Sequence, residues 1–265
     1  MTIIDAHAHI YPDNIALKAA ASIGEFYEIP MCMSGTLSEL LRKGKEAGIS
    51  RFLVHSVAVT WERVHSINDY LMQTVQAHPK ELIGFGTLHP EHPDVRGELK
   101  RLKAGGMIGI KLHPDFQHFC LDDPKAIALF RELANLNMPL LTHTGDRRHP
   151  YSQPERMVKA LKAVPDLRVI CAHFGGWSIW EEAWKMLAGL PNVWVDSSSS
   201  LYAITPETAA ELVRRFGADR VFFGTDYPMW DPAEELERFF RLPLTPPEQE
   251  MILHRNLETF LSFHQ

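Results

Sequence analysis

The sequence predicts a single α/β barrel of eight parallel strands. Eight short apolar segments alternate with helical segments, and the length of 265 residues is close to the roughly 250 that such barrels commonly need. The strands are expected to begin at Ile3, Ile49, Leu82, Met107, Pro139, Leu167, Val193 and Val221. An open doubly wound sheet would normally carry a glycine-rich turn after its first strand, where this chain has histidines. We therefore predict a (β/α)8, or TIM, barrel.

Helices in the first half are expected from leucine spacing and from capping residues. Thr36 caps a helix at 37–47, and Gly48 ends it before the second strand. An earlier helix is expected at 14–23, followed by an irregular loop at 24–35 that covers the site. The remaining helices of this half are expected at 64–77, 95–104 and 125–136.

The same alternation continues through the second half. Helices are expected at 154–164, 178–187 and 206–216, and after the last strand at 231–240, 246–254 and 257–263. No linker, internal repeat or low-complexity stretch interrupts this pattern. One domain over residues 1–265 is therefore expected.

Composition and charge indicate an ordinary globular protein with a small-molecule substrate. Hydrophobic residues make up 45% and charged residues 23%, and the net charge of −6 comes without a basic run that would favour nucleic acid or an anionic membrane. Three widely spaced cysteines form no disulfide framework. With no signal peptide and no long apolar stretch, we expect a cytoplasmic protein. The sequence is compatible with a homo-oligomer but identifies no interface.

A histidine pair near the N-terminus predicts a metal site. The first strand is expected to run into His7 and His9, and the alternation of strand side chains places both imidazoles on one face. Imidazole nitrogen binds zinc at about 2.0–2.1 Å and also suits related divalent ions. Asp5 is expected on the same face, deeper in the barrel, where its carboxylate would orient a ligand histidine.

Polar side chains also follow four later strands. In this class of barrel the chemistry lies at the carboxyl ends of the strands, so residues at these positions converge on one site. They are Lys111 and His113 after the fourth strand, His143 after the fifth, His173 after the sixth and Asp226 after the eighth.

Five motifs carry a resemblance to the amidohydrolase superfamily. They are Asp5-x-His7-x-His9, Gly109-Ile110-Lys111-Leu112-His113-Pro114, Thr142-His143-Thr144-Gly145, Ala172-His173-Phe174-Gly175-Gly176 and Gly224-Thr225-Asp226-Tyr227-Pro228. The chain resembles the amidohydrolase-2 branch, which also contains aminocarboxymuconate-semialdehyde decarboxylase. The motifs are specific for the superfamily and poorly specific for the reaction.

The resemblance implies a metal-bearing barrel. His7, His9, His143 and Asp226 match the usual ligands of one divalent ion, most often zinc, although two ions or another divalent metal also fit. This set leaves an open coordination position, which distinguishes a catalytic ion from a structural one. His173 matches a histidine that acts beside the metal-bound water or binds a second ion. Asp226 and His173 are therefore the expected catalytic groups.

Lys111 has two possible roles. In binuclear relatives such as dihydroorotases, a fourth-strand lysine is carbamylated and bridges two metals, and the segment around Lys111 is similar. Alternatively, Lys111 stays an ammonium that pairs with a substrate carboxylate. His113, Arg147, Trp177 and Tyr227 are further candidate substrate contacts, because they follow strand ends.

Two reactions suit these groups. Zinc lowers the pKa of a bound water from 15.7 to about 7, which predicts hydrolysis of an amide, lactam, lactone or related carbonyl derivative of a small acidic metabolite. The alternative is non-oxidative decarboxylation, for which Arg147 and Arg148 offer cations. The lysine-bearing motif favours the hydrolase. A third possibility, a non-catalytic metal-binding barrel, needs no base, whereas Asp226 and His173 both lie where a base is required.

Overall fold

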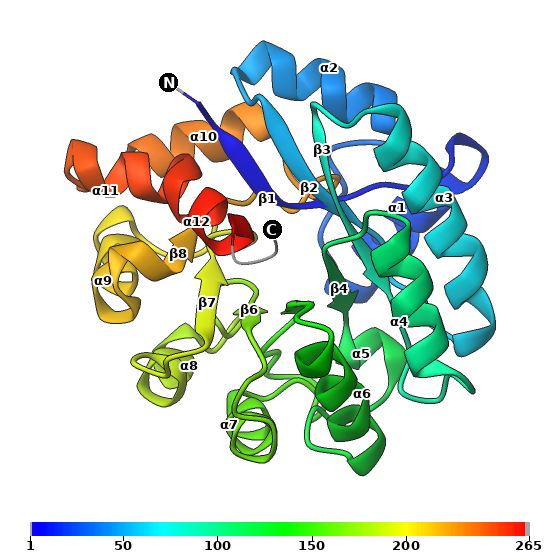
Figure 1. Cartoon of the computed structure of the whole chain (residues 1–265). Coiled ribbons are helices and arrows are strands. Elements are labelled where there is room, and N and C mark those ends of the chain that lie inside the picture. The colour runs from blue at the N-terminus through cyan, green and yellow to red at the C-terminus, as the bar shows by residue number, and fades with distance from the viewer. Residues whose placement is uncertain (1, 263–265) are drawn as a thin grey trace.

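A ring of eight parallel strands forms the centre of the computed structural model, which describes residues 2–262 (Figure 1). The strands lie in sequence order, and each pairs in parallel with the next. They are β1 (Ile4–His9), β2 (Arg51–His55), β3 (Leu82–Thr87), β4 (Gly109–Leu112), β5 (Leu140–Thr142), β6 (Val169–Cys171), β7 (Val193–Asp196) and β8 (Val221–Phe222). Each begins within two residues of its expected start, so the predicted barrel is confirmed.

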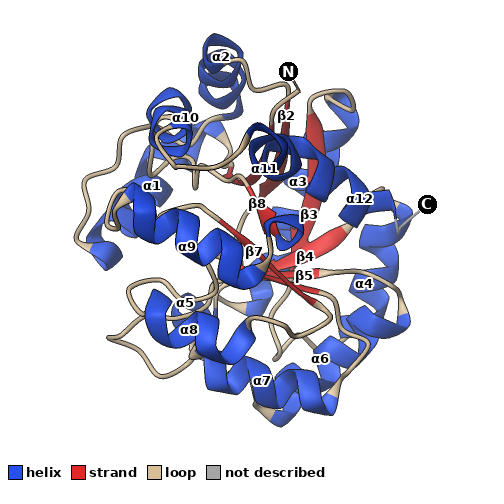
Figure 2. Cartoon of the chain, turned by 90° about the vertical axis from the view of Figure 1, so that its left-hand side faces the viewer, coloured by secondary structure: helices blue, strands red, loops and turns tan. Residues whose placement is uncertain are grey.

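Helices surround the strands, as the side view shows (Figure 2). They are α1 (Asp13–Tyr27), α2 (Leu37–Ala47), α3 (Val64–Ala77), α4 (Val95–Ala104), α5 (Pro114–Gln117), α6 (Pro124–Asn135), α7 (Pro154–Ala163), α8 (Trp180–Leu187), α9 (Pro206–Phe216), α10 (Pro232–Phe240), α11 (Pro246–Glu250) and α12 (Asn256–Ser262). A π-helical turn at Met251–Arg255 joins α11 to α12. The short helix α5 was not predicted, and the expected helix end at residue 263 lies outside the described residues.

Backbone hydrogen bonds join the first strand to the segment after the last one. The N–H of His9 donates to the carbonyl of Tyr227 at 2.7 Å, and the N–H of Asp226 donates to the carbonyl of His7 at 2.8 Å. Pairing of the two outer strands removes the exposed edges that an open sheet would have. This seam brings the histidine pair of β1 next to Asp226.

The barrel interior is filled with apolar side chains at its amino end. Ile4, Leu53 and Phe222 belong to one buried cluster that draws on strands all around the ring, and Leu257 and Phe260 of α12 join it. In Figure 1, α12 lies over this end of the barrel. The polar side chains are therefore left to gather at the opposite, carboxyl end.

α1 continues four residues beyond its expected end, so the prediction of a loop from residue 24 was wrong for that stretch. The chain after the helix folds back closely, and a Cβ at Gly24 would lie only 2.9 Å from the carbonyl oxygen of Ile29. Glycine is therefore needed there for packing, not to break the helix. The extra turn carries Phe26 and Tyr27, and the Phe26 ring packs against Phe116 at 4.5 Å.

β1 contains an irregularity that changes which side chains face the lumen. Its register with β2 shifts between Asp5 and Ala8. Ala6 packs in the lumen cluster, whereas Ala8 packs in the outer cluster, although strict alternation would put both on one face. The carboxylate of Asp5 accepts hydrogen bonds from the backbone N–H of His7 and of Thr225, both at 2.9 Å. The expectation that Asp5 orients a ligand imidazole was therefore wrong, because it ties β1 to the end of β8.

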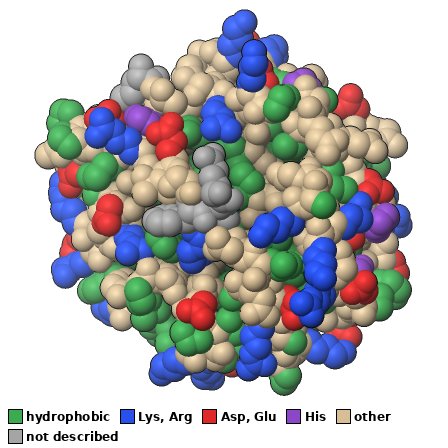
Figure 3. All heavy atoms as spheres, viewed as in Figure 1, with side chains coloured by type: hydrophobic (Ala, Val, Ile, Leu, Met, Phe, Trp, Pro, Cys, Tyr) green, Lys and Arg blue, Asp and Glu red, His purple; other side chains and the backbone are tan. Residues whose placement is uncertain are grey.

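Charged side chains on the outside are mixed in sign. On the face shown in Figure 3, Lys and Arg are interspersed with Asp and Glu. Several pair along a single helix, such as Arg42 with Glu46 at 2.9 Å and Arg215 with Glu211 at 2.9 Å. Exposed pairs of this kind contribute little to stability. Within residues 2–262, no helix combines the length and the apolar character that a membrane span requires.

Candidate metal centre

His7, His9 and Asp226 face one another across the seam. Oδ1 of Asp226 lies 3.4 Å from Nε2 of His7 and 3.4 Å from Nε2 of His9, and all three residues are buried. Ligands that bind one tetrahedral ion at about 2.1 Å lie about 3.4 Å from each other. Both distances to the Asp226 oxygen therefore match the spacing that a shared divalent ion imposes.

Asp196, the last residue of β7, fixes the ring of His7. Its Oδ2 lies 2.9 Å from Nδ1 of His7, so Nδ1–H donates to the carboxylate and Nε2 is left free for an ion. Burial raises the pKa of Asp196, but the facing His7 imidazole, His173 and the Ser198 hydroxyl together outweigh burial and lower that pKa to about 2. Sequence reasoning passed over Asp196, although its place at a strand end was the signal that could have identified it.

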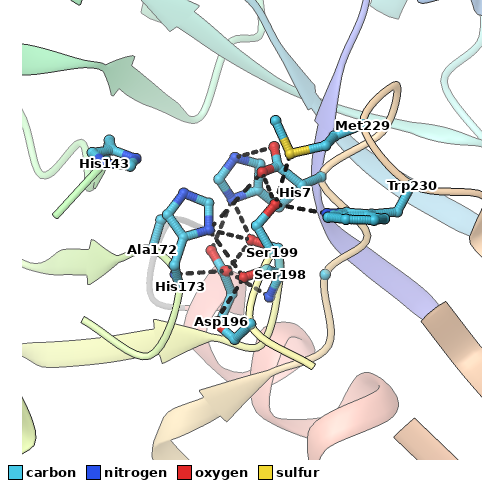
Figure 4. Close-up of polar contacts among 12 residues, drawn as sticks. His7, His143, Ala172, His173, Asp196, Ser198, Ser199, Met229 and Trp230 are labelled. Carbon is cyan, nitrogen blue, oxygen red and sulfur yellow. Dashed lines mark hydrogen bonds and ion pairs between the residues drawn. The ribbon is translucent and has the colours of Figure 1, made fainter. Parts of the chain in front are cut away.

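His173 is held beside this pair by the segment that follows β7. Its Nδ1 lies 3.0 Å from the carbonyl oxygen of Ser198, which assigns the proton to Nδ1 and directs Nε2 away from that carbonyl. The same Nδ1 lies 4.0 Å from Oδ2 of Asp226. Figure 4 shows how Ser198 connects His7, His173 and Asp196. Burial lowers the pKa of His173 to about 4, so the ring is neutral at pH 7.

Asp226 is oriented by a second hydroxyl. The Ser199 hydroxyl donates to Oδ2 of Asp226 at 2.5 Å, and Nε1–H of Trp230 donates to the Ser199 oxygen at 2.9 Å. Burial raises the pKa of Asp226, but the imidazoles of His7 and His9 outweigh it and hold that pKa well below 3.8. The carboxylate is therefore ionised at neutral pH. No specific signal in the sequence pointed to Ser199.

Lys111 reaches the same centre from β4. Its side chain is fully buried, and Nζ lies 3.1 Å from Nε2 of His7. Within residues 2–262, no carboxylate oxygen lies at ion-pair distance from Nζ. Burial lowers the pKa of Lys111 to about 8, against the opposing pull of Asp226 and Asp196. A carbamylated lysine that bridges two metals and an ammonium that pairs with a substrate carboxylate would both have to lie next to the metal ligands, as Lys111 does.

His143 lies next to this group without joining its contacts. Its Nε2 donates to the carbonyl oxygen of Gly145 at 2.9 Å, and its Nδ1 lies 3.4 Å from the hydroxyl of Tyr27. Figure 4 shows the ring apart from the network around His7, and its centroid is 4.9 Å from that of His173. Of the four expected ligands, His143 is thus the one whose hydrogen bonds, to Gly145 and Tyr27, lie outside the network around His7 and Asp226.

Tyr27 and His113 form the wall opposite the seam. The hydroxyl of Tyr27 lies 2.7 Å from Nε2 of His113. The His113 ring stacks between His143, at 4.2 Å, and Phe116, at 3.8 Å. Tyr27 was missed because the helix that carries it was expected to end at residue 23. His113, in contrast, lies where its place after β4 predicts.

The two arginines after β5 are engaged outside the pocket. Arg147 is exposed, and its backbone N–H and guanidinium donate to Ser178 at 3.0 and 3.2 Å. Arg148 donates from two nitrogens to the two carboxylate oxygens of Asp146, at 3.0 and 2.8 Å. Neither guanidinium lines the pocket around the histidines.

The two aromatic candidates also lie outside the pocket lining. Trp177 packs edge-on against Tyr27, with ring centroids 4.9 Å apart, and so supports the wall from behind. Tyr227 is fully buried, and its hydroxyl donates to the carbonyl of Thr36 at 2.8 Å, at the start of α2. The sequence placed both residues near the site, and the structure gives both a packing position.

A narrow pocket opens at the carboxyl end of the barrel. Its lining consists of His7, His9, Ile23, Tyr27, Met31, Lys111, His113, Phe116, His173, Asp226, Pro228 and Met229. A larger, mainly apolar pocket adjoins it and shares His9, Ile23 and Phe116. Met31 was expected in a covering loop and does reach the pocket. The site thus combines a polar floor with an apolar flank.

A further histidine that sequence reasoning did not single out lies at the floor. His55 ends β2, is fully buried and contacts the rings of His7 and His9. Burial lowers its pKa well below 6.5, so it is neutral. It was overlooked because it falls inside the apolar run 49–57.

The sequence profile of the family described as amidohydrolase matches residues 4–263. The chain belongs to the amidohydrolase family. Three solved structures share its fold over almost the whole chain. An uncharacterised TIM-barrel protein from Bordetella bronchiseptica is 21% identical, with a TM-score of 0.81 and 99% of each chain covered.

The two other structures bear names of different enzymes. A dihydroxybenzoic acid decarboxylase from Polaromonas sp. JS666, with bound manganese and 2-nitroresorcinol, is 17% identical, with a TM-score of 0.75 and coverage of 100% of this chain and 98% of that one. A probable 2-pyrone-4,6-dicarboxylic acid hydrolase from Acinetobacter baumannii, with citric acid bound, is 19% identical, with a TM-score of 0.73 and coverage of 99% and 100%. The family resemblance expected from the motifs is confirmed, and this amidohydrolase is a metal-dependent barrel enzyme.

Proposed function

We propose that this amidohydrolase is a hydrolase that cleaves an amide, lactam, lactone or related carbonyl derivative of a small acidic molecule. The observation that carries the proposal is the ionised Asp226, whose Oδ1 is shared between His7 and His9 while its Oδ2 faces His173. One carboxylate is thereby placed both to hold an ion and to accept a proton.

The residues present fit a divalent ion. His7, His9 and Asp226 would hold it, and His143 is the fourth ligand that the motifs suggest. Such an ion supplies Lewis acidity and lowers the pKa of a water from 15.7 to about 7. Nitrogen ligands favour zinc, and manganese is the alternative, as in the Polaromonas decarboxylase. The buried ring nitrogens of His55, which have no hydrogen-bond partner among the described residues, are consistent with a cation beside the rings of His7 and His9.

The chain's own groups then divide the remaining work. Asp226 accepts the proton of the attacking water at Oδ2, with the carboxylate held by Ser199. His173 lies on the same side and orients the water or the substrate carbonyl. Lys111 provides the positive charge that binds a substrate carboxylate. The hydroxyl of Tyr27, held in place by its hydrogen bond to His113, is available to the substrate. The neighbouring apolar pocket accepts the rest of the substrate.

A decarboxylase is the second candidate, because the Polaromonas enzyme with that name has the same fold. That reaction needs a cation near the substrate carboxylate. Arg148 is paired with Asp146 and Arg147 is bound to Ser178, so among the described residues Lys111 is the one cationic side chain that lines the pocket. Lys111 would serve either reaction, and we favour hydrolysis because the ionised Asp226 is placed to accept the proton of an attacking water.

The experiment separates the two reactions on one preparation. Protein loaded with zinc or with manganese is offered lactones and cyclic amides that carry a carboxylate, and hydroxybenzoates, while proton release and carbon dioxide are both recorded. We expect hydrolysis that Asp226→Asn abolishes. Carbon dioxide release without hydrolysis would overturn the hydrolase in favour of the decarboxylase.

The state of Lys111 is tested on the same protein. Intact mass measured under native conditions, after growth with zinc and bicarbonate, shows whether a carbamate is attached. An unmodified Lys111 supports the role as substrate cation and one ion per chain. A carbamate on Lys111 with two ions per chain would replace that role by metal bridging and keep the hydrolase.

A further inference from the structure

We propose that His55, at the end of β2, is an additional ligand of the divalent ion held by His7 and His9. The inference rests on the proposed metal-dependent function, because it concerns the same centre. His55 lies outside all five motifs on which the family resemblance depends. It is the position of the strand in the barrel, and not a sequence signature, that brings this imidazole to the site.

The strand pairing points His55 into the lumen. Leu53 belongs to the apolar cluster inside the barrel, and His55 follows two positions later on the same face of β2. It pairs in register with His9 of the neighbouring strand. The ring centroid of His55 is 4.3 Å from that of His9 and 4.8 Å from that of His7, in nearly perpendicular orientations.

The nitrogens of His55 have no other partner. Nδ1 and Nε2 are both buried without a hydrogen bond to any described residue, and Nδ1 of His9 is in the same condition. Buried polar groups in proteins are almost always satisfied. His89, the buried histidine just after β3, shows the usual arrangement, because its Nε2 lies 3.2 Å from the Gln117 carbonyl and its Nδ1 accepts from the Glu91 N–H. A cation between the rings would bind one of the two unpaired nitrogens of His55.

The spacing of the three rings suits one ion. His7, His9 and His55 each offer a nitrogen within 4.8 Å of those of the other two. Two nitrogens that bind the same ion at about 2.1 Å lie at most about 4.2 Å apart, so only small side-chain rotations are needed. The His7, His173 and Asp196 cluster has similar spacing, but its atoms already bond to one another and to Ser198.

The test measures metal binding by purified full-length protein. Zinc affinity is determined by competition with a chelating dye, and the visible absorption of the cobalt-loaded protein reports the ligand set. We expect His55→Gln to weaken zinc binding at least about tenfold and to change the cobalt spectrum. His89→Gln, which alters a buried histidine at the next strand end, is the matched control and should leave both unchanged.

Each outcome decides the matter. Wild-type affinity and an unchanged cobalt spectrum in His55→Gln would overturn the role of His55 and leave the proposed hydrolase intact. If the wild-type protein fails to bind zinc or cobalt, both the role of His55 and the proposed metal-dependent hydrolase are excluded. If His55→Gln does not fold, ¹⁵N spectra of the histidine rings in the wild-type protein replace it: zinc must shift a ring nitrogen of His55, and an unshifted ring contradicts the proposal.

Discussion

Asp196 Oδ2 lies 2.9 Å from His7 Nδ1, and both side chains are fully buried. The contact connects β7 to β1 across the intervening strand β8. It fixes both the tautomer and the ring angle of a metal-ligand candidate. Partners of this kind set the affinity of the ion as strongly as some direct ligands.

Asp196→Asn is expected to lower zinc affinity by about 10- to 100-fold, because the amide removes the charge that holds the Nδ1 proton. Dye competition at fixed pH measures the change. Asp166→Asn, which alters an exposed aspartate, is the matched control. Equal affinity in Asp196→Asn and the wild type would show that the contact serves packing alone.

Asp226→Asn is expected to reduce kcat/KM by at least about 10²- to 10⁴-fold, since it removes the proton acceptor. Ser199→Ala removes only the hydroxyl that orients the carboxylate and should cost less. Steady-state rates on the best substrate, with circular dichroism to verify folding, provide the measurement. Activity within a factor of two of the wild type in Asp226→Asn would exclude it as the base.

Tyr27→Phe tests the wall that helix α1 contributes. Loss of one hydrogen bond of about 0.5–1.5 kcal/mol corresponds to a roughly 2- to 10-fold change, and we expect it in KM because Tyr27 contacts the substrate side. Tyr151→Phe, at a partly buried tyrosine outside the pocket, serves as control. A Tyr27→Phe enzyme with wild-type KM and kcat would remove Tyr27 from the site.

The stability of the metal-free protein should fall as the pH drops from 6 to 5. Five buried histidines have pKa values of about 4 or well below 6.5, so they stay neutral when folded but bind protons when unfolded; they are His9, His55, His113, His143 and His173. Three buried carboxyl groups act in the opposite sense, because burial raises their pKa to about 7; they are Asp5, Asp115 and Glu235.

The unfolded chain therefore binds up to two more protons in this interval. Stability is then lost toward acid, by at most about 3 kcal/mol per pH unit. Urea unfolding with a chelator present, at pH 6 and at pH 5, measures the slope. A free energy of unfolding that is constant or rises toward pH 5 would contradict the neutral state of these histidines.

Zinc should stabilise the fold against heat, and a chelator should reverse the effect. An ion that binds only the folded chain adds about 2.7 kcal/mol when its free concentration is a hundred times Kd. Thermal unfolding with zinc, with chelator, and with zinc restored gives the comparison. Identical melting temperatures in all three samples would indicate that the histidines and Asp226 do not form a cation site.

The strand ends were predictable from the sequence, and the exceptions have physical causes. Apolar runs of four to six residues locate the strands, so His7, His9, Lys111, His173 and Asp226 come together as expected. Asp5 departs from the prediction because a register shift in β1 interrupts the alternation of side chains. Period-two arguments fail at such a bulge, which no residue type announces.

Tyr27 and His55 were missed because the local sequence around each of them is compatible with two different structural roles. Gly24 marks a close approach of the returning chain, and its reading as a helix end removed Tyr27 from consideration. His55 sits in an apolar run, where a single histidine does not disturb the strand pattern. The pairing of β1 with β2, which sets His55 opposite His9, shows that it meets His7 and His9.

The seam between β1 and β8 also sets when the centre can exist. Asp5 and Thr225, which clasp the two ends, are 220 positions apart in the chain. At a synthesis rate of about 5–20 residues per second, the carboxylate of Asp226 follows the histidine pair by roughly 10–45 seconds. A nascent chain therefore exposes its histidines long before their partner emerges, and the complete ligand set is assembled only after Asp226 has been synthesised.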